Sequence, residues 1–186
     1  IERDNKQSFD DKTKRIKKSG NKKQIMENSN LSSLIDNDIL KILYSRGITT
    51  EKEVIEFLNP KMENIQNPYG LKDMEKTVLE IEKAIEEQKN IWIFGDYDVD
   101  GITSTSILYM ALKELGAENV NYYIPIRDEG YGLNNEALKK IKDSGADLVI
   151  TVDCGITAFP EVEFANSIDL PIIITDHHNL HGGKVP

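Results

Sequence analysis

Four short apolar runs alternate with stretches of helical spacing, and this alternation constrains the fold more than any other feature of the chain. The runs occupy residues 91–94, 120–125, 148–152 and 171–175. Continuous apolar runs of this length are typical of strands buried on both faces of a parallel sheet. The helical stretches between them occupy residues 102–115, 135–142 and 158–167. The pattern therefore predicts right-handed βαβ units, and so an α/β fold with a parallel β-sheet flanked by helices.

The segment ahead of these runs is predicted to be helical. Its first apolar stretch begins at Leu31, repeats at helical spacing and ends near Gly47, which suits a C-cap. Thr50 and Glu53 form a capping box that opens a second helix. A third helix is expected near the end of this segment. We therefore expect a helical lead-in over residues 31–90, followed by the α/β domain over 91–186.

Charge is unevenly distributed along the chain. The net charge is -9. Residues 1–30 hold nine Lys or Arg against five Asp or Glu, which gives +4, so the other 156 residues carry -13. The polar, basic segment 1–30 is expected to be a disordered or loosely helical arm, with a nucleic-acid-binding strip as the alternative. The acidic body is compatible with a phosphate-bearing substrate if its carboxylates hold divalent cations.

The compartment is inferred from two sequence features. Cys154 is the single cysteine, which excludes an internal disulfide and fits a reducing cytoplasm. The sequence has no apolar run of membrane-spanning length and no signal-peptide pattern at its start. We therefore expect a cytoplasmic protein without a membrane partner.

Acidic and imidazole side chains follow three of the four predicted strands. They are Asp96, Asp98, Asp100, Asp153, Asp176, His177 and His178. Ligands of parallel sheets bind outside the carboxyl ends of the strands. This mixture of carboxylate and imidazole suits Mn²⁺, with Mg²⁺ and Zn²⁺ as alternatives. Two such ions, roughly 3.5–4 Å apart, activate a water and stabilise the leaving oxygen in phosphoryl displacement.

Three other interpretations of the acidic motifs fit less well. An EF-hand loop counted from Asp96 would need Glu at position twelve, where Ile107 stands, and it would follow a helix. A phosphatase nucleophile loop of the haloacid-dehalogenase type would leave Asp100, Asp153 and the histidine pair without a role. Helix capping explains one Asp at a helix start, but not a set at three strand ends.

Taken together, the motifs resemble the DHH phosphoesterase superfamily. The resemblance rests on Gly-Asp-Tyr-Asp-Val-Asp-Gly at 95–101, Val-Asp-Cys-Gly at 152–155 and Asp-His-His at 176–178. Further segments resemble the RecJ family of bacterial single-strand-specific exonucleases. They are Phe-Leu-Asn-Pro at 57–60, Leu-Lys-Asp-Met at 71–74, Ile-Pro-Ile-Arg at 124–127 and Glu-Gly-Tyr-Gly-Leu at 129–133. The resemblance covers residues 31–178.

This resemblance implies a Rossmann-like DHH domain that degrades single-stranded DNA in the 5′→3′ direction with Mn²⁺ or Mg²⁺, in recombination and repair. It implies two ions, held by Asp98, Asp100, Asp153 and His177, with Asp153 bridging them. Asp96 would be a further ligand or a supporting acid. Asp176 would orient a histidine, because metal-bound imidazoles usually donate their other N–H to a carboxylate. His178 would face the scissile phosphate.

Other expectations concern substrate and partners. Arg127 is predicted to contact phosphate, by its charge and its place at a strand end, with a structural capping role as the alternative. Tyr131 is a candidate to stack a base, whereas Trp92, Tyr122 and Tyr123 are expected in the core. A helicase or a single-strand-binding protein is a candidate partner, and a monomer is the expected state.

The sequence also departs from the family pattern. Members continue beyond Asp-His-His with another metal-binding Asp, a second domain and an OB-type DNA-binding module, and this sequence stops at Pro186. We therefore expect a domain truncated on its C-terminal side and an isolated chain without appreciable activity. Two rival functions stay open: a DHH hydrolase of short RNA, cyclic dinucleotides or pyrophosphate, and a non-catalytic DHH scaffold.

Overall fold

The computed structural model describes residues 35–180 and 182–186. It divides into two compact units, of which the first ends at Asn67 and the second spans Pro68–Pro186. The predicted arm over 1–30, the start of the first predicted helix and His181 lie outside the described residues.

The first unit is helical. It contains α3 (Asn37–Ser45), α4 (Glu51–Leu58) and the short 3-10 helix η2 (Met62–Asn64). The predicted capping box of α4 is confirmed, because Thr50 Oγ1 accepts from the Glu53 N–H and Glu53 Oε2 accepts from the Thr50 N–H. Leu40, Leu43 and Val54 form the buried core of this unit.

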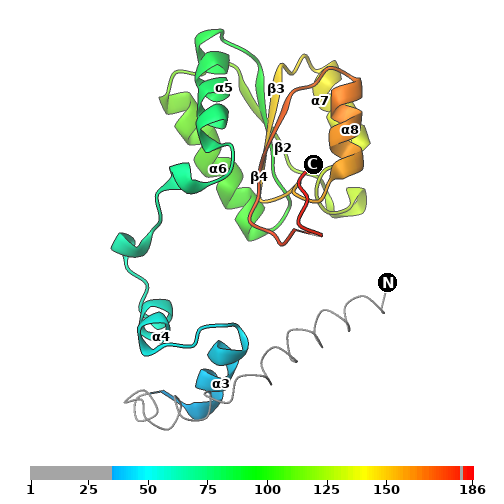
Figure 1. Cartoon of the computed structure of the whole chain (residues 1–186). Coiled ribbons are helices and arrows are strands. Elements are labelled where there is room, and N and C mark those ends of the chain that lie inside the picture. Colours follow the sequence, from blue (N-terminus) through cyan, green and yellow to red (C-terminus); the bar gives the residue numbers. More distant parts are fainter. Residues whose placement is uncertain (1–34, 181) are drawn as a thin grey trace. The chain divides into compact units, whose positions relative to one another are not determined.

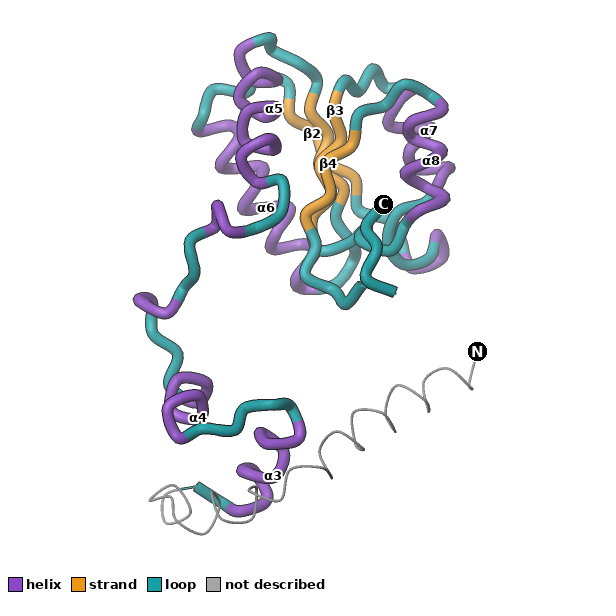
Figure 2. The backbone as a smooth tube through the Cα atoms, viewed as in Figure 1, coloured by secondary structure: helices purple, strands orange, loops and turns teal. Residues whose placement is uncertain are grey.

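The second unit is an α/β domain built on four parallel strands (Figures 1 and 2). The strands are β1 (Ile91–Phe94), β2 (Val120–Tyr123), β3 (Leu148–Val152) and β4 (Ile172–Thr175), in the order β2-β1-β3-β4. The helices are α5 (Met74–Glu86), α6 (Val99–Glu114), α7 (Asn135–Asp143) and α8 (Phe159–Ser167), with 3-10 turns η3 (Pro68–Gly70) and η4 (Arg127–Glu129). The predicted α/β class is confirmed.

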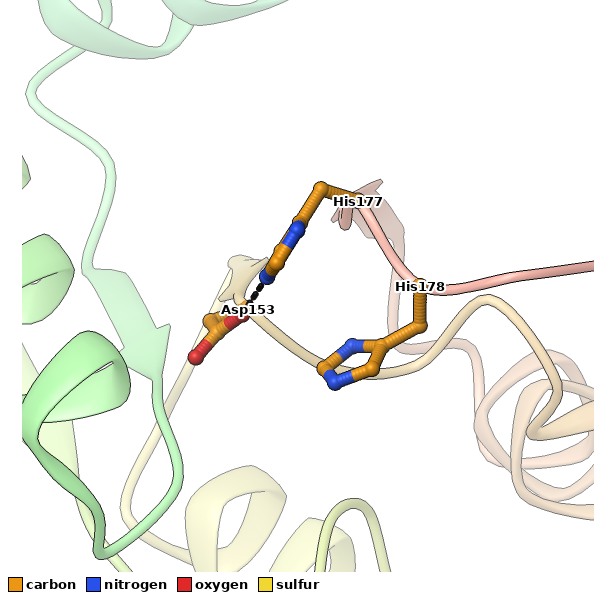
Figure 3. Close-up of side chains that lie close together, drawn as sticks. All are labelled: Asp153, His177 and His178. Atoms are coloured by element: carbon orange, nitrogen blue, oxygen red, sulfur yellow. Dashed lines mark ion pairs between the residues drawn. The ribbon is translucent and has the colours of Figure 1, made fainter. Parts of the chain in front are cut away.

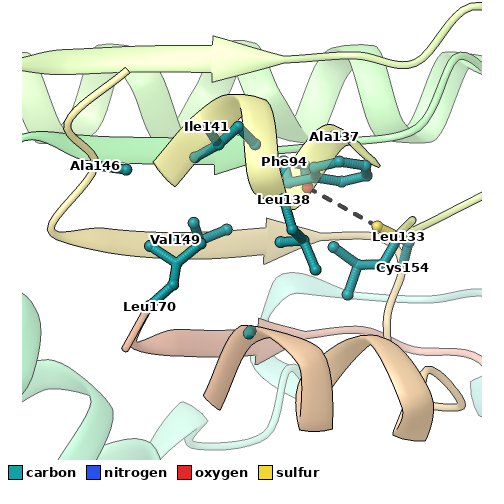
Figure 4. Packing of buried hydrophobic residues seen from close by; sticks show 10 residues of the cluster. Phe94, Leu133, Ala137, Leu138, Ile141, Ala146, Val149, Cys154 and Leu170 are labelled. Carbon is teal, nitrogen blue, oxygen red and sulfur yellow. Dashed lines mark hydrogen bonds between the residues drawn. The ribbon is translucent and has the colours of Figure 1, made fainter. Parts of the chain in front are cut away.

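Helices cover both faces of the sheet, α5 and α6 on one side and α7 and α8 on the other (Figure 1). Alternate residues of β1 point to opposite faces. Ile91 and Ile93 pack in the core beneath α5 and α6, whereas Phe94 packs on the other face with Leu138 of α7 (Figure 4). Ala165 of α8 belongs to the same cluster as Phe94. The continuous apolar pattern of the strands follows from this burial on two faces.

Helix α5 packs against the sheet through Ala84 and belongs to the second unit, which begins at Pro68. One sequence-based expectation differs from the structure. Tyr122 was expected in the core, but its side chain is 61% exposed. The reason is that β2 is an edge strand, so Tyr122 has a neighbouring strand on one side only; its ring packs edge-on against Tyr109 of α6 and stays open to solvent beyond it. Trp92 and Tyr123 are partly buried and pack against the core.

The strand order places a switch point between β1 and β3. The chain leaves β1 through α6 to reach β2 on one side, and it leaves β3 through α8 to reach β4 on the other. Connections that diverge in this way open a crevice at the carboxyl ends of the two central strands. Within the described residues, no helix is both long and apolar enough to cross a bilayer.

Candidate metal centre

The loop after β1 buries one of its carboxylates completely. Asp96 has no exposed surface, and its Oδ1 accepts the Asp98 N–H at 3.2 Å. Its Oδ2 is buried and has no hydrogen-bond partner among the described residues. Burial raises the pKa of Asp96, and the nearby Asp98 and Asp153 carboxylates add to this rise. A cation would relieve the cost of an unpaired buried carboxylate oxygen.

Two glycines allow this loop to pack against the start of α6. A Cβ atom on Gly101 would overlap the Asp96 carboxylate and backbone, and a Cβ on Gly95 would overlap Thr105 Oγ1. Glycine is therefore required where the helix meets the strand end, because no side chain fits between them.

Asp98 caps helix α6. Its Oδ1 accepts the Asp100 N–H at 2.9 Å and the Gly101 N–H at 3.1 Å. The hydrogen bond from the Gly101 backbone, followed by that from Asp100, lowers the pKa of Asp98. The carboxylate is exposed and stays ionised at neutral pH, which leaves its second oxygen able to serve as a ligand.

Asp153 lies immediately after β3 and is nearly buried, with 8% of its surface exposed. Its backbone is left-handed, with φ of 59°, and its N–H donates to Thr175 O at 3.0 Å. Asp153 Oδ1 lies 2.8 Å from His177 Nε2, the pair marked by the dashed line in Figure 3. This oxygen makes no hydrogen bond with good geometry among the described residues, so it is a second buried carboxylate oxygen suited to a cation.

Asp176 and His178 form a pair after β4. Asp176 Oδ1 lies 2.7 Å from His178 Nδ1 and accepts the His178 N–H at 3.0 Å, while Oδ2 accepts the Ile156 N–H at 2.9 Å. Burial opposes ionisation of Asp176, but the hydrogen bonds from His178 and Ile156 outweigh it and lower the pKa. The hydrogen bond with Asp176 raises the pKa of His178. Asp176 thus fixes the orientation of the His178 ring.

The candidate ligands fall into two sets. The ligand atoms of Asp96, Asp98 and Asp153 lie within 4.8 Å of one another, and so do those of Asp153, His177 and His178. Asp153 is common to both sets. Their carboxylate oxygens and imidazole nitrogens fit divalent cations that prefer oxygen and imidazole ligands. These atoms include the buried Asp96 Oδ2, which has no hydrogen-bond partner among the described residues, and Asp153 Oδ1, which lies against His177 Nε2.

The remaining predicted ligand, Asp100, belongs to neither set. It lines an open pocket beside them together with Asp153, Asp176 and His177. His178, which was predicted to face the phosphate, is also one of the candidate ligands (Figure 3).

Arg127 lies at the end of a row of aromatic rings. Its guanidinium carbon is 4.9 Å from the Tyr97 ring centroid, and Tyr97 packs edge-on against Tyr131 with 6.0 Å between centroids. Tyr131 in turn packs edge-on against His178 at 6.3 Å. Burial and the neighbouring Asp96 carboxylate raise the pKa of Tyr131, so its hydroxyl stays protonated. The row connects the predicted phosphate contact to the histidine pair.

Sequence reasoning did not single out three side chains at this site. Thr103 and Ser104 line the same pocket, and Tyr97 holds Arg127. The first two had a sequence signal, because residues three and four positions after Asp100 share its helix face. Tyr97 had none, since its ring is placed by the loop conformation.

Comparisons with known proteins agree with this geometry. The chain is 43% identical over 141 residues to the single-stranded-DNA-specific exonuclease RecJ of Bacillus subtilis, covering 75% of this chain and 18% of that protein. It is 33% identical over 166 residues to the enzyme of the same name from Escherichia coli, covering 89% of this chain and 28% of that one. The chain therefore spans about a fifth to a quarter of the length of these relatives.

A solved structure has the same fold. The crystal structure of RecJ in complex with Mn²⁺ from Thermus thermophilus matches with a TM-score of 0.56 and 32% identity, over 77% of this chain and 19% of that one. The family model described as "DHH family, N-terminal domain" matches residues 90–186, more than half of the chain. With its acidic loop after β1, an Asp153 common to both ligand sets and an Asp-His-His triplet after β4, the chain belongs to the DHH family.

Proposed function

We propose that this chain is the metal-binding part of a RecJ-type exonuclease, which hydrolyses phosphodiester bonds of single-stranded DNA in the 5′→3′ direction. The observation that carries the proposal is the sharing of Asp153 between two ligand sets at the switch point of the sheet. Relatives named as single-stranded-DNA-specific exonucleases support the substrate, and the relative solved with Mn²⁺ supports the metal.

We further propose two ion positions, one for each ligand set, with Asp153 contributing to both. Asp96 and Asp98 complete the first set, and His177 completes the second with His178 beside it. When bound, a pair of Mn²⁺ or Mg²⁺ ions would activate a water and stabilise the leaving oxygen. Asp100 would contact this site from the pocket wall.

Neighbouring groups of the protein hold the side chains of Asp98 and His178 in place. Asp98 stays ionised because α6 backbone N–H groups bind it. Asp176 accepts from the His178 ring, which turns Nε2 toward Tyr131, 3.5 Å from its hydroxyl. For His178, held in this orientation, the proposed role is a contact with the scissile phosphate, and binding of the second ion is the alternative.

Substrate contacts are proposed for the aromatic row. Arg127 is positively charged, exposed and held by stacking on Tyr97, which suits a phosphate contact in an otherwise acidic domain. Tyr131 is exposed enough to stack on a base. We also propose a helicase or single-strand-binding protein as partner, a monomeric state and a cytoplasmic location. The buried Cys154 thiol, which is not part of a disulfide, fits a reducing compartment.

The test uses the full-length gene product that contains this chain. With Mn²⁺, it should release mononucleotides from a single strand blocked at its 3′ end, and it should leave a strand blocked at its 5′ end intact. Asp153→Asn should abolish this release while preserving the fold. Hydrolysis of cyclic dinucleotides or pyrophosphate with no action on DNA would contradict the proposal and favour another DHH hydrolase.

A further inference from the structure

Helix α6 carries four consecutive hydroxyl side chains, of which one differs from the rest. Thr103, Thr105 and Ser106 each donate to the carbonyl four residues earlier, at 2.7, 2.7 and 2.8 Å. Such bonds are the usual way for Ser and Thr to satisfy their hydroxyls inside a helix. The Ser104 hydroxyl makes no hydrogen bond to any residue of the described ranges.

Ser104 lies at the open pocket that Asp100, Asp153, Asp176 and His177 line, and its hydroxyl has no hydrogen-bond partner there among the described residues. Three hydroxyl side chains line that pocket: Thr103, Ser104 and Thr175. Thr103 donates to the helix backbone, and Thr175 donates to Thr151 O at 2.6 Å. Among these three, Ser104 alone has a donor available for a bound molecule.

The chemistry of the pocket wall indicates what that molecule presents. Asp100, Asp153 and Asp176 contribute acceptors to the wall, and carboxylates attract cations and repel phosphates. A neutral hydroxyl adds a donor without adding charge. It therefore complements an acceptor oxygen brought into the pocket beside the cations, such as a non-bridging phosphate oxygen.

We infer that the Ser104 hydroxyl donates a hydrogen bond to a non-bridging oxygen of the phosphodiester bound in this pocket. The inference rests on the proposed function and adds a substrate contact to it. Ser104 follows Asp100 by one helical turn, so both side chains project from the same face of α6. The contact thus lies on the rigid helix that begins at the Asp98 cap.

The test compares Ser104→Ala with Ser106→Ala in the same helix. Ser106 is exposed, donates to Ile102 O and does not line the pocket. The probe is a dithymidine with a hydrolysis-resistant phosphorothioate link, titrated calorimetrically into the chain in Mn²⁺, with inorganic phosphate as a second probe. Mn²⁺ affinity is measured separately by electron paramagnetic resonance, and folding by circular dichroism.

Ser104→Ala should leave Mn²⁺ affinity unchanged and weaken dithymidine binding about ten-fold, which is the size expected for one hydrogen bond to a charged acceptor. Ser106→Ala should bind both Mn²⁺ and dithymidine like the unmodified chain. Equal dithymidine affinity in the two variants would overturn the inference. A loss of Mn²⁺ affinity in Ser104→Ala would also overturn it, since the hydroxyl would then act on the metal ligands.

Two further outcomes separate this inference from the proposed function. If the unmodified chain binds Mn²⁺ and dithymidine and Ser104→Ala does so equally well, only the role of Ser104 is wrong. If the unmodified chain does not bind Mn²⁺, the metal site itself is wrong and the inference falls with it. Weakened binding of inorganic phosphate with unchanged dithymidine binding would overturn the assignment to a phosphodiester.

Discussion

Asp153 and His177 follow different strands, β3 and β4, yet their side chains meet with 2.8 Å between Oδ1 and Nε2. The meeting follows from the register of the sheet, in which Val152 pairs with Thr175. Each strand ends one or two residues before its functional side chain. The parallel sheet thereby aligns two sequence motifs that lie more than 20 residues apart.

Asp153→Asn should remove most of the Mn²⁺-dependent rise in melting temperature. Asn tolerates the left-handed backbone at this position but loses the charge that both ligand sets share. An ion at 100 times its dissociation constant adds about 2.7 kcal/mol to the free energy of unfolding, and most of this should be lost. Thermal unfolding with Mn²⁺ and with a chelator measures it. The exposed acid Glu163 supplies the control, and an equal shift in Asp153→Asn and Glu163→Gln would place the ion elsewhere.

Gly101→Ala should destabilise the α/β unit. The added methyl group would overlap the Asp96 carboxylate and backbone, and overpacking of this kind costs about 1–3 kcal/mol. Chemical denaturation without metal measures the free energy of unfolding. Gly70→Ala is the matched control, because a Cβ there meets nothing within 4 Å. Similar stability for the two variants would mean that the loop rearranges freely around residue 101.

Glu129 should make stability depend on pH at the loop that precedes Tyr131. The hydrogen bond from the Tyr123 hydroxyl, at 2.7 Å, and that from the Ile126 N–H, at 2.9 Å, lower the pKa of Glu129. A lowered pKa contributes stability above the unfolded-state value of about 4.3, which is lost as pH falls through the folded-state value. Glu129→Gln should therefore melt at a lower temperature at pH 7, and the difference should shrink below pH 4.

The pH profile of Glu82→Gln serves as the comparison for this effect, because Glu82 is exposed on α5. A constant difference between the unmodified chain and Glu129→Gln from pH 7 to pH 3 would show that Glu129 acts through packing and not through its charge.

Arg127→Ala should weaken binding of a single-stranded oligonucleotide to the Mn²⁺-loaded, full-length protein. Loss of one phosphate contact lowers affinity for all sequences alike and reduces the slope of log K against log salt by about 0.7 for a single strand. Fluorescence anisotropy at several salt concentrations measures both quantities. Arg127→Lys tests the stacking on Tyr97, because Lys keeps the charge without the planar group. An unchanged salt slope in Arg127→Ala would assign Arg127 a structural role.

The sequence patterns that predicted the fold are local ones. Apolar runs with few polar residues indicated strands that are covered on both faces of the sheet. The structure has all four of these strands, and they are parallel. The capping box at Thr50 could be predicted from the sequence because it depends on two residues three positions apart. The exposure of Tyr122 could not, because strand order decides which strand forms an edge, and the order β2-β1-β3-β4 has no counterpart in the local pattern.

The same distinction holds for the candidate site. Strand ends in a parallel sheet meet at one edge, so the convergence of Asp96, Asp153 and His177 was predictable. Which acids of the loop after β1 join a ligand set and which line the pocket was not predictable, because this depends on where α6 begins. The helix starts at Val99, which places Asp100 on the pocket wall. The free hydroxyl of Ser104 depends on a side-chain rotamer, and sequence alone does not give it.

The left-handed backbone at Asp153 has a consequence for how this domain can diverge. Apart from glycine, few residues adopt φ of 59° without strain, and asparagine and aspartate are the principal exceptions. A duplicated gene that gave up metal-dependent chemistry would therefore keep its fold most easily by acquiring Asn or Gly at this position. A lineage with either residue there would be marked as one that lost the reaction while retaining the architecture.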